Sequence, residues 1–206
     1  MARKPIIVEG KPFPQTEGGF TTVCADPPWP YNTSKTGRFA MPKPLDDIGQ
    51  VGVESMGFPI MELEEIQNLP IKQVIAKNAH LYLWTTNSFM EQAYAVARAW
   101  GFKPTTIITW VKVKKDDPTT PSMKTGYWFR GATEHCLFAT RGSLPKPPVA
   151  IPTAFMHPRI AQHSAKPESF YTDIVETVSP GPYLELFSRN RREGWNVWGN
   201  QLPPRE

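Results

Sequence analysis

Residues 26–29, Asp-Pro-Pro-Trp, join an acid, two prolines and a large flat ring directly after an apolar run. A carboxylate accepts a hydrogen bond from an exocyclic amine, and the prolines lack N–H groups, so their carbonyl oxygens are acceptors in a fixed geometry. The ring of Trp29 offers a face for stacking, and a flipped adenine or cytosine is held by such contacts. The alternative is a turn that ends a strand, with Trp29 packed in the core. These four residues alone leave both interpretations open.

The cysteines and histidines give no sign of a metal site or of a nucleophile. Cys24 and Cys136 each lie in an apolar, strand-like stretch, which predicts buried thiols in a reducing compartment. A zinc site needs more Cys and His at ligand spacing than this chain has. His135, His157 and His163 are interpreted as structural or hydrogen-bonding groups.

Basic residues gather between positions 112 and 146. Seven cations and three acids lie there, which gives +4, equal to the formal net charge of the whole chain. Such clustering suits a polyanion, whereas the alternative is a solvated loop, and charge alone decides neither. The candidate substrate-binding cations are Lys114, Lys115, Lys124 and Arg130.

Length and composition predict a single domain over residues 1–206. A chain of 206 residues that is 40% hydrophobic can bury a sizeable core. It has no apolar window of about 18 residues, so no transmembrane helix is expected. The N-terminal apolar run, Ile6 to Val8, is too short for a signal peptide, which favours a cytoplasmic location and excludes a membrane partner.

Strand and helix patterns alternate along the chain, which predicts an α/β fold with a mostly parallel sheet. Strands are predicted at 20–25, 80–86, 105–113, 134–142, 183–189 and 194–202, helices at 61–69, 88–100 and 166–179, and long loops at about 31–58 and 113–131. Ligands of such sheets bind beyond the carboxyl ends of the strands. Segments 26–29 and 188–192 both follow predicted strands, so we expect them to share one crevice.

The stretch ADPPWPY (25–31) resembles the catalytic motif of amino-group methyltransferases that act on adenine in nucleic acid. Further motifs that resemble those of such methyltransferases follow it in order: LYLWTT (81–86), WVK (110–112), TGYWFRGATEHCLFATRG (125–142), HSAKPE (163–168), LELFSR (184–189) and WGNQL (198–202). From Phe20 to Leu202 the set resembles the MT-A70-like family of N6-adenine methyltransferases, in its compact bacterial or phage form.

The resemblance implies a Rossmann-like methyltransferase fold with a permuted motif order, in which the catalytic motif precedes the S-adenosylmethionine (SAM) motif. It places Asp26 beside both the target amine and the methyl donor. The Pro27 carbonyl would accept from the amine, Pro28 would stiffen the turn, and Trp29 would stack on or wall the adenine. Tyr31 would assist in substrate binding.

The same resemblance implies the cofactor contacts. Lys166 matches the lysine that meets the SAM carboxylate, and Arg189 matches an arginine near the ribose. Phe187 lies in the LELFSR stretch, which replaces the usual glycine-rich loop around the methionine part of SAM. Asn200 and Gln201 match the pair that bonds the ribose or the adenine of SAM.

These resemblances predict a SAM-dependent N6-adenine methyltransferase, with DNA favoured as substrate. Two alternatives remain open: an RNA N6-adenine methyltransferase, and a non-catalytic nucleic-acid-binding subunit. The family implies that the two long loops cover the target base. The sequence leaves a monomer and a dimer equally open.

Overall fold

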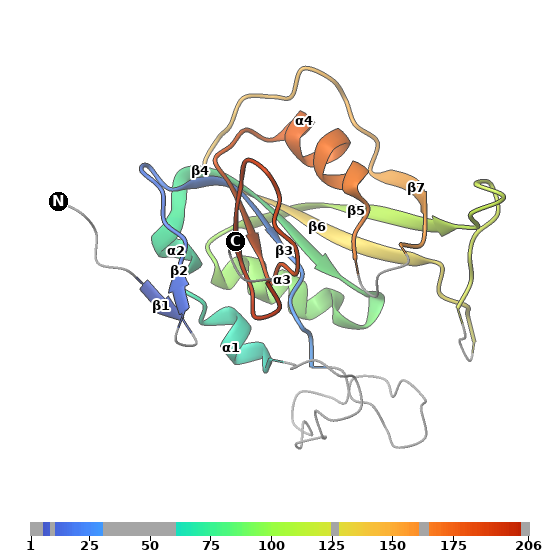
Figure 1. Ribbon diagram of the computed structural model, residues 1–206, viewed down its shortest axis with the longest axis horizontal. Helices are drawn as coiled ribbons and strands as arrows, with labels where there is room; N and C mark the ends of the chain where they lie inside the picture. The colour runs from blue at the N-terminus through green and yellow to red at the C-terminus, as the bar shows by residue number, and fades with distance from the viewer. Residues whose placement is uncertain (1–5, 9–10, 31–60, 125–127, 161–164, 203–206) are drawn as a thin grey trace.

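The computed structural model describes residues 6–8, 11–30, 61–124, 128–160 and 165–202 (Figure 1). Its elements, in chain order, are β1 Ile6–Val8, β2 Lys11–Phe13, β3 Phe20–Ala25, α1 Leu63–Gln67, α2 Ile71–Val74, β4 Ile75–Thr85, η3 Asn87–Phe89, α3 Met90–Ala99, β5 Lys103–Val113, β6 Thr133–Arg141, β7 Ala154–Pro158, η4 Phe170–Val175, α4 Glu176–Val178, β8 Tyr183–Leu186 and β9 Trp195–Trp198. The element η4 is a π-helix that continues into α4.

Seven of the strands form one sheet in the order β7-β5-β6-β4-β3-β8-β9, and β1 pairs with β2 separately. Within the large sheet β6 runs antiparallel to both neighbours, β4 and β5, whereas the other pairings are parallel. The prediction of a mostly parallel α/β sheet of the Rossmann-like methyltransferase type is therefore confirmed.

Strand β4 shows why the sheet has a core on each face. Successive side chains of a strand point to opposite faces. Leu81 and Leu83 join the core on the side of α1 and α3, while Tyr82 and Trp84 pack with residues of η4 on the other side. Figure 1 shows α1 and α3 below the sheet and α4 above it.

The chain order creates a crevice beside β3. Strand β3 lies between two parallel neighbours, β4 and β8. Strand β4 follows β3 in the chain, whereas β8 comes much later, after β5, β6 and β7, so the strand order reverses at β3. Ligands of open α/β sheets bind where the strand order reverses in this way, outside the carboxyl ends. The segments after β3 and β8 carry the two motifs singled out in the sequence.

Two predicted helices differ in detail from those observed. The helix expected at 88–100 begins as η3 and continues as α3, and it ends before Gly101, whose φ of +86° suits a C-terminal glycine. The helix expected at 166–179 contains the π-helix η4, which buries Phe170 and Tyr171 side by side. Strand β7 was not predicted, because its segment lies in proline-rich chain.

Candidate active site

The turn after β3 is fixed by backbone hydrogen bonds. The Trp29 N–H donates to the Pro27 carbonyl at 2.8 Å, and the Met61 N–H donates to the Pro28 carbonyl at 3.0 Å. Both prolines restrict φ, so the turn has little freedom. Asp26 is thereby held directly beyond the carboxyl end of β3, half-buried, as the sequence predicts.

Trp29 does not offer a stacking face, which corrects the first interpretation. It is 2% exposed, and its ring stacks on Phe89 with centroids 5.7 Å apart and planes 13° apart. Its indole Nε1 donates to the Trp84 carbonyl at 3.1 Å. The apolar ring gains more from the core than from the surface, so Trp29 contributes to the site by anchoring the turn.

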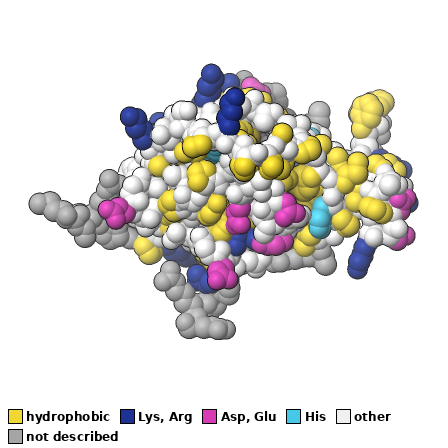
Figure 2. Space-filling view, turned by 90° about the horizontal axis from the view of Figure 1, so that it is seen from above, with side chains coloured by type: hydrophobic (Ala, Val, Ile, Leu, Met, Phe, Trp, Pro, Cys, Tyr) yellow, Lys and Arg dark blue, Asp and Glu magenta, His cyan; other side chains and the backbone are white. Residues whose placement is uncertain are grey.

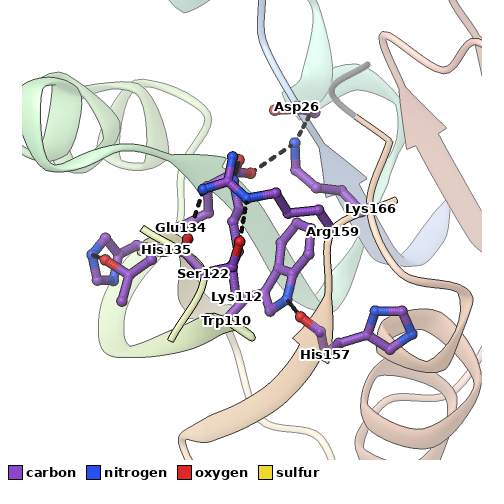
Figure 3. Close-up of polar contacts among 10 residues, drawn as sticks. Asp26, Trp110, Lys112, Ser122, Glu134, His135, His157, Arg159 and Lys166 are labelled. Atoms are coloured by element: carbon purple, nitrogen blue, oxygen red, sulfur yellow. Dashed lines mark hydrogen bonds and ion pairs between the residues drawn. The ribbon is translucent and has the colours of Figure 1, made fainter. Parts of the chain in front are cut away.

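A row of alternating charges joins Asp26 to the start of β6 (Figure 3). Lys166 Nζ lies 2.5 Å from Asp26 Oδ2 and 3.3 Å from Glu134 Oε2, and Lys112 Nζ pairs with the other oxygen of Glu134. The Lys166 side chain is 7% exposed, and its Nζ also lies 5.1 Å from the centre of the Trp84 ring. A buried ammonium with two carboxylate partners is a fixed positive charge beside the catalytic candidate.

The protonation of this row follows from its contacts. Burial alone lowers the pKa of Lys166, but Asp26 and Glu134 raise it more, so it lies above its usual value. Burial raises the pKa of Glu134, yet Lys166 and Lys112 lower it further, and the result is a lowered pKa. Burial lowers the pKa of Lys112 and Glu134 raises it, but burial has the larger effect, so the pKa lies below its usual value. Glu134 is therefore ionised and Lys166 charged near neutral pH.

A cavity of about 300 Å³ lies beside Asp26, lined also by Lys166, Phe187 and Arg189. Phe187 follows β8 directly and has a φ of +60°, a conformation that residues other than glycine seldom adopt. Such strain persists only where the surroundings impose it, and it is frequent in ligand clamps. Four of the predicted cofactor residues therefore line one cavity: Asp26, Lys166, Phe187 and Arg189.

The far wall of the cavity carries a second polar group that the sequence analysis missed. The Tyr171 hydroxyl donates to Glu185 Oε1 at 2.7 Å, and the Arg192 guanidinium lies 3.6 Å from the centre of the Tyr171 ring. Burial raises the pKa of Glu185, although the Tyr171 hydrogen bond lowers it in part. Two carboxylates therefore line the cavity: Glu185, on β8, and Asp26, directly after β3.

Other predicted site residues lie away from this cavity. Asn200 and Gln201 are exposed and are not among the residues that line it, and Asn200 Oδ1 accepts from Lys11 Nζ at 3.0 Å. The four candidate cations of the basic segment, Lys114, Lys115, Lys124 and Arg130, are exposed on the β5–β6 connection. Tyr31 and His163 lie outside the described residues.

The cysteines are buried free thiols, as predicted. Burial raises the pKa of both Cys24 and Cys136 well above the usual value, so neither supplies a thiolate. Among the described residues, no group of three or more His, Cys, Asp or Glu side chains is arranged for a metal ion. Within the same ranges, no helix has the length and apolar character needed to cross a bilayer.

Gly199, directly after β9, packs closely against Ser188 in the segment that follows β8. A Cβ at Gly199 would lie 2.2 Å from the Ser188 carbonyl oxygen and 2.9 Å from its nitrogen. Gly199→Ala is therefore expected to lower the free energy of unfolding by about 1–3 kcal/mol, measured by urea denaturation. Gly131→Ala is the control, because nothing lies within 4 Å of that Cβ. Equal stability of the two variants would contradict the argument.

The mostly parallel sheet, with an acid beyond an inner strand and a polar cavity beside it, is that of a Rossmann-like methyltransferase. The MT-A70 family profile matches residues 20–201, and the chain belongs to this family.

Three known relatives match nearly the whole chain. The type II methyltransferase M.MunI of Mycoplasma sp is 27% identical over 93% of this chain and 82% of its own length. An MT-A70-like protein of Medicago truncatula is 28% identical over 90% of this chain but 27% of its own length. The N6-methyladenosine RNA methyltransferase MTA1 of Cryphonectria parasitica is 26% identical over 89% of this chain and 52% of its own length. The chain thus spans most of one relative and about half or less of the other two.

Proposed function

We propose that this protein transfers the methyl group of SAM to N6 of adenine in DNA. The observation that carries the proposal is the position of Asp26, which lies beyond the carboxyl end of β3, lines the cavity and is paired with a buried Lys166. A carboxylate there can accept from an amino group on one side while the cavity holds the methyl donor on the other.

The residues around the cavity fit SAM. Its volume of about 300 Å³ is at the lower end of the range for small-ligand pockets. Lys166 and Arg189 supply cations for the carboxylate and polar groups of SAM, whereas Asp26 and Glu185 supply acceptors for its ammonium and hydroxyl groups. When bound, SAM supplies a methyl group on a positively charged sulfur.

The turn after β3 orients the amine. Lys166 binds Asp26 Oδ2, and we assign Oδ1 to one N–H of the target amine and the Pro27 carbonyl to the other. An exocyclic amine is a weak nucleophile because its lone pair is delocalised into the ring, and two acceptors favour the geometry that directs the lone pair towards the cavity. Orientation then supplies much of the rate, and the released proton passes to Asp26 or to water.

DNA is proposed because the chain is similar to the type II methyltransferase M.MunI along 82% of that protein's length. RNA is the second candidate, which the similarity to the RNA methyltransferase MTA1 favours. The presence of Asp26 and Lys166 as a bonded pair beside the cavity argues against a non-catalytic subunit, since such a subunit has no need of that pair there.

The test is methyl transfer from SAM with an isotopic label in the methyl group, using single- and double-stranded DNA and RNA of the same sequence. Nucleoside analysis should find labelled N6-methyladenine, with the highest rate on DNA. A higher rate on RNA would select the second candidate, and no transfer to any of the four would refute the enzymatic proposal.

Binding to nucleic acid should depend on salt. The exposed cations Lys114, Lys115, Lys124 and Arg130 can each neutralise one phosphate. If all four do so on duplex DNA, the slope of log K against log salt concentration is about −3.6, and Lys114→Gln reduces its magnitude by about 0.9. Exposed Lys77, on β4, provides the control: Lys77→Gln should leave the slope unchanged. Anisotropy titrations at several salt concentrations measure it, and a flat dependence would discard the interface.

A further inference from the structure

Two aromatic side chains stand out on the β5–β6 connection. Trp128 is 84% exposed and Phe129 is 91% exposed, whereas the other large exposed hydrophobic side chains of the described ranges are aliphatic or Met. Figure 2 shows hydrophobic side chains projecting as a knob from the end of the molecule where this connection lies. Large apolar groups on an accessible surface are typical of sites that bind other molecules.

The base of this projection is ordered by the backbone. The Lys124 N–H donates to the Gly131 carbonyl at 2.9 Å, and the Lys112 N–H donates to the Ala132 carbonyl at 2.7 Å. Arg159 adds a bond of 2.7 Å to the Ser122 carbonyl. Trp128 and Phe129, which we call the aromatic tip, are therefore presented by a loop whose two ends are closed.

The charges around the aromatic tip favour a polyanion as the partner. Lys124 and Arg130 are exposed at the two ends of the loop, and Lys114 and Lys115 follow β5 nearby. A second copy of this chain, with its formal net charge of +4, would be repelled by these cations. Aromatic rings between cations are the usual means of holding a nucleic acid strand, because every base has a face on which a ring can stack.

The aromatic tip is also within reach of the catalytic candidate. Glu134, which pairs with Lys166 beside Asp26, is five residues from Phe129 along the chain. Five extended residues span at most about 17 Å, and successive nucleotides of a strand are about 3.4 Å apart along the axis. The aromatic tip is therefore near enough to reach nucleotides within about five positions of the target adenine.

We propose that Trp128 and Phe129 stack on bases of the DNA strand that flank the target adenine. This inference rests on the proposed function and deepens it, because it assigns the strand contact that holds the substrate while its adenine enters the site. Stacking accounts for the exposure of both rings, for their cationic neighbours and for the closed loop that presents them.

The experiment compares Trp128→Phe with Trp128→Leu. Both keep an apolar side chain, but only the phenylalanine keeps a flat face. The probe is a labelled DNA oligonucleotide that wild type methylates at one adenine, and affinity is measured by fluorescence anisotropy. Trp128→Leu should bind roughly 5- to 150-fold more weakly, and Trp128→Phe should remain close to wild type. Val149→Ala, which changes a half-exposed side chain elsewhere, is the control.

A second arm replaces single bases of the oligonucleotide by abasic sites. At the position that Trp128 covers, loss of the base should weaken binding by wild type but add nothing to the loss in Trp128→Leu. Additive losses at every flanking position, or full affinity of Trp128→Leu, would overturn the inference. So would a change in oligomer size by sedimentation velocity with unchanged DNA affinity, which would assign the tip to a second copy.

The two proposals can fail separately. If wild type methylates DNA and the leucine variant binds it normally, the stacking role is wrong and the proposed function stands. If wild type methylates none of the four nucleic acids, both are wrong. Unchanged SAM affinity by calorimetry shows that the variants are folded, since the aromatic tip is not among the residues that line the cavity.

Discussion

Asp26→Asn is expected to reduce the rate of methyl transfer by roughly 10²–10⁴-fold, the usual effect of removing one positioned catalytic group. The amide keeps the shape of the side chain but removes the charge that orients the amine. Its oxygen can still accept from Lys166, but the N–H₂ group then faces the target amine and cannot accept from it, and the 2.5 Å contact to Lys166 is no longer an ion pair. Labelled methyl transfer at saturating SAM and DNA measures the change, and calorimetry should show that SAM binding largely persists.

The variant should fold, because Lys166 keeps Glu134 as a partner at 3.3 Å. Asp173→Asn makes the same change on an exposed acid of η4 and should behave as wild type. Near wild-type transfer by Asp26→Asn would show that the carboxylate has no part in the reaction, and the role assigned to it would have to be abandoned.

The strands and their common edge could be predicted from sequence, since they depend on local patterns. Strand β3 has its predicted bounds, Phe20–Ala25, and Asp26 follows it as expected. Successive side chains of β4 point to opposite faces of the sheet and join two different cores, and this alternation can be read from the sequence as a period of two residues. Strand β7 was missed because five residues in proline-rich chain become a strand only through pairing with β5, which is a tertiary effect.

The contacts within the site were less predictable. Glu134 was missed because its pairing with Lys166 requires knowing that β6 runs antiparallel, which brings the first residues of β6 to the carboxyl edge of the sheet. The available signal was an acid at the start of a predicted strand. The place of Trp29 stayed open because four residues cannot show where Phe89 lies, and the stacking role that the resemblance implied does not agree with its burial. The permuted order of the motifs required the family resemblance, since spacing alone does not reveal it.

Lys166→Met is expected to weaken SAM binding by roughly 10- to 150-fold, the loss that follows removal of a hydrogen bond to a charged group. It also leaves Asp26 and Glu134 without the cation between them. Their side chains are 35% and 21% exposed, so water relieves part of the cost, and the free energy of unfolding should fall by about 1–3 kcal/mol. Calorimetry and urea denaturation measure the two effects, with exposed Lys77→Met as the control.

The pH dependence of stability separates an ion-pair role for Lys166 from simple packing. In wild type the lowered pKa of Glu134 stabilises the fold above its usual value of about 4.3, and this contribution is lost as the pH falls through the lowered pKa. The raised pKa of Lys166 stabilises the fold below about 10.4, and this contribution is lost as the pH rises through the raised value. In Lys166→Met the alkaline loss should disappear. The acid loss should become smaller and end at a higher pH, because the pKa of Glu134 in the folded protein is higher without Lys166. Identical pH profiles of the two proteins would show that Lys166 contributes only packing, and its place beside the catalytic acid would need another explanation.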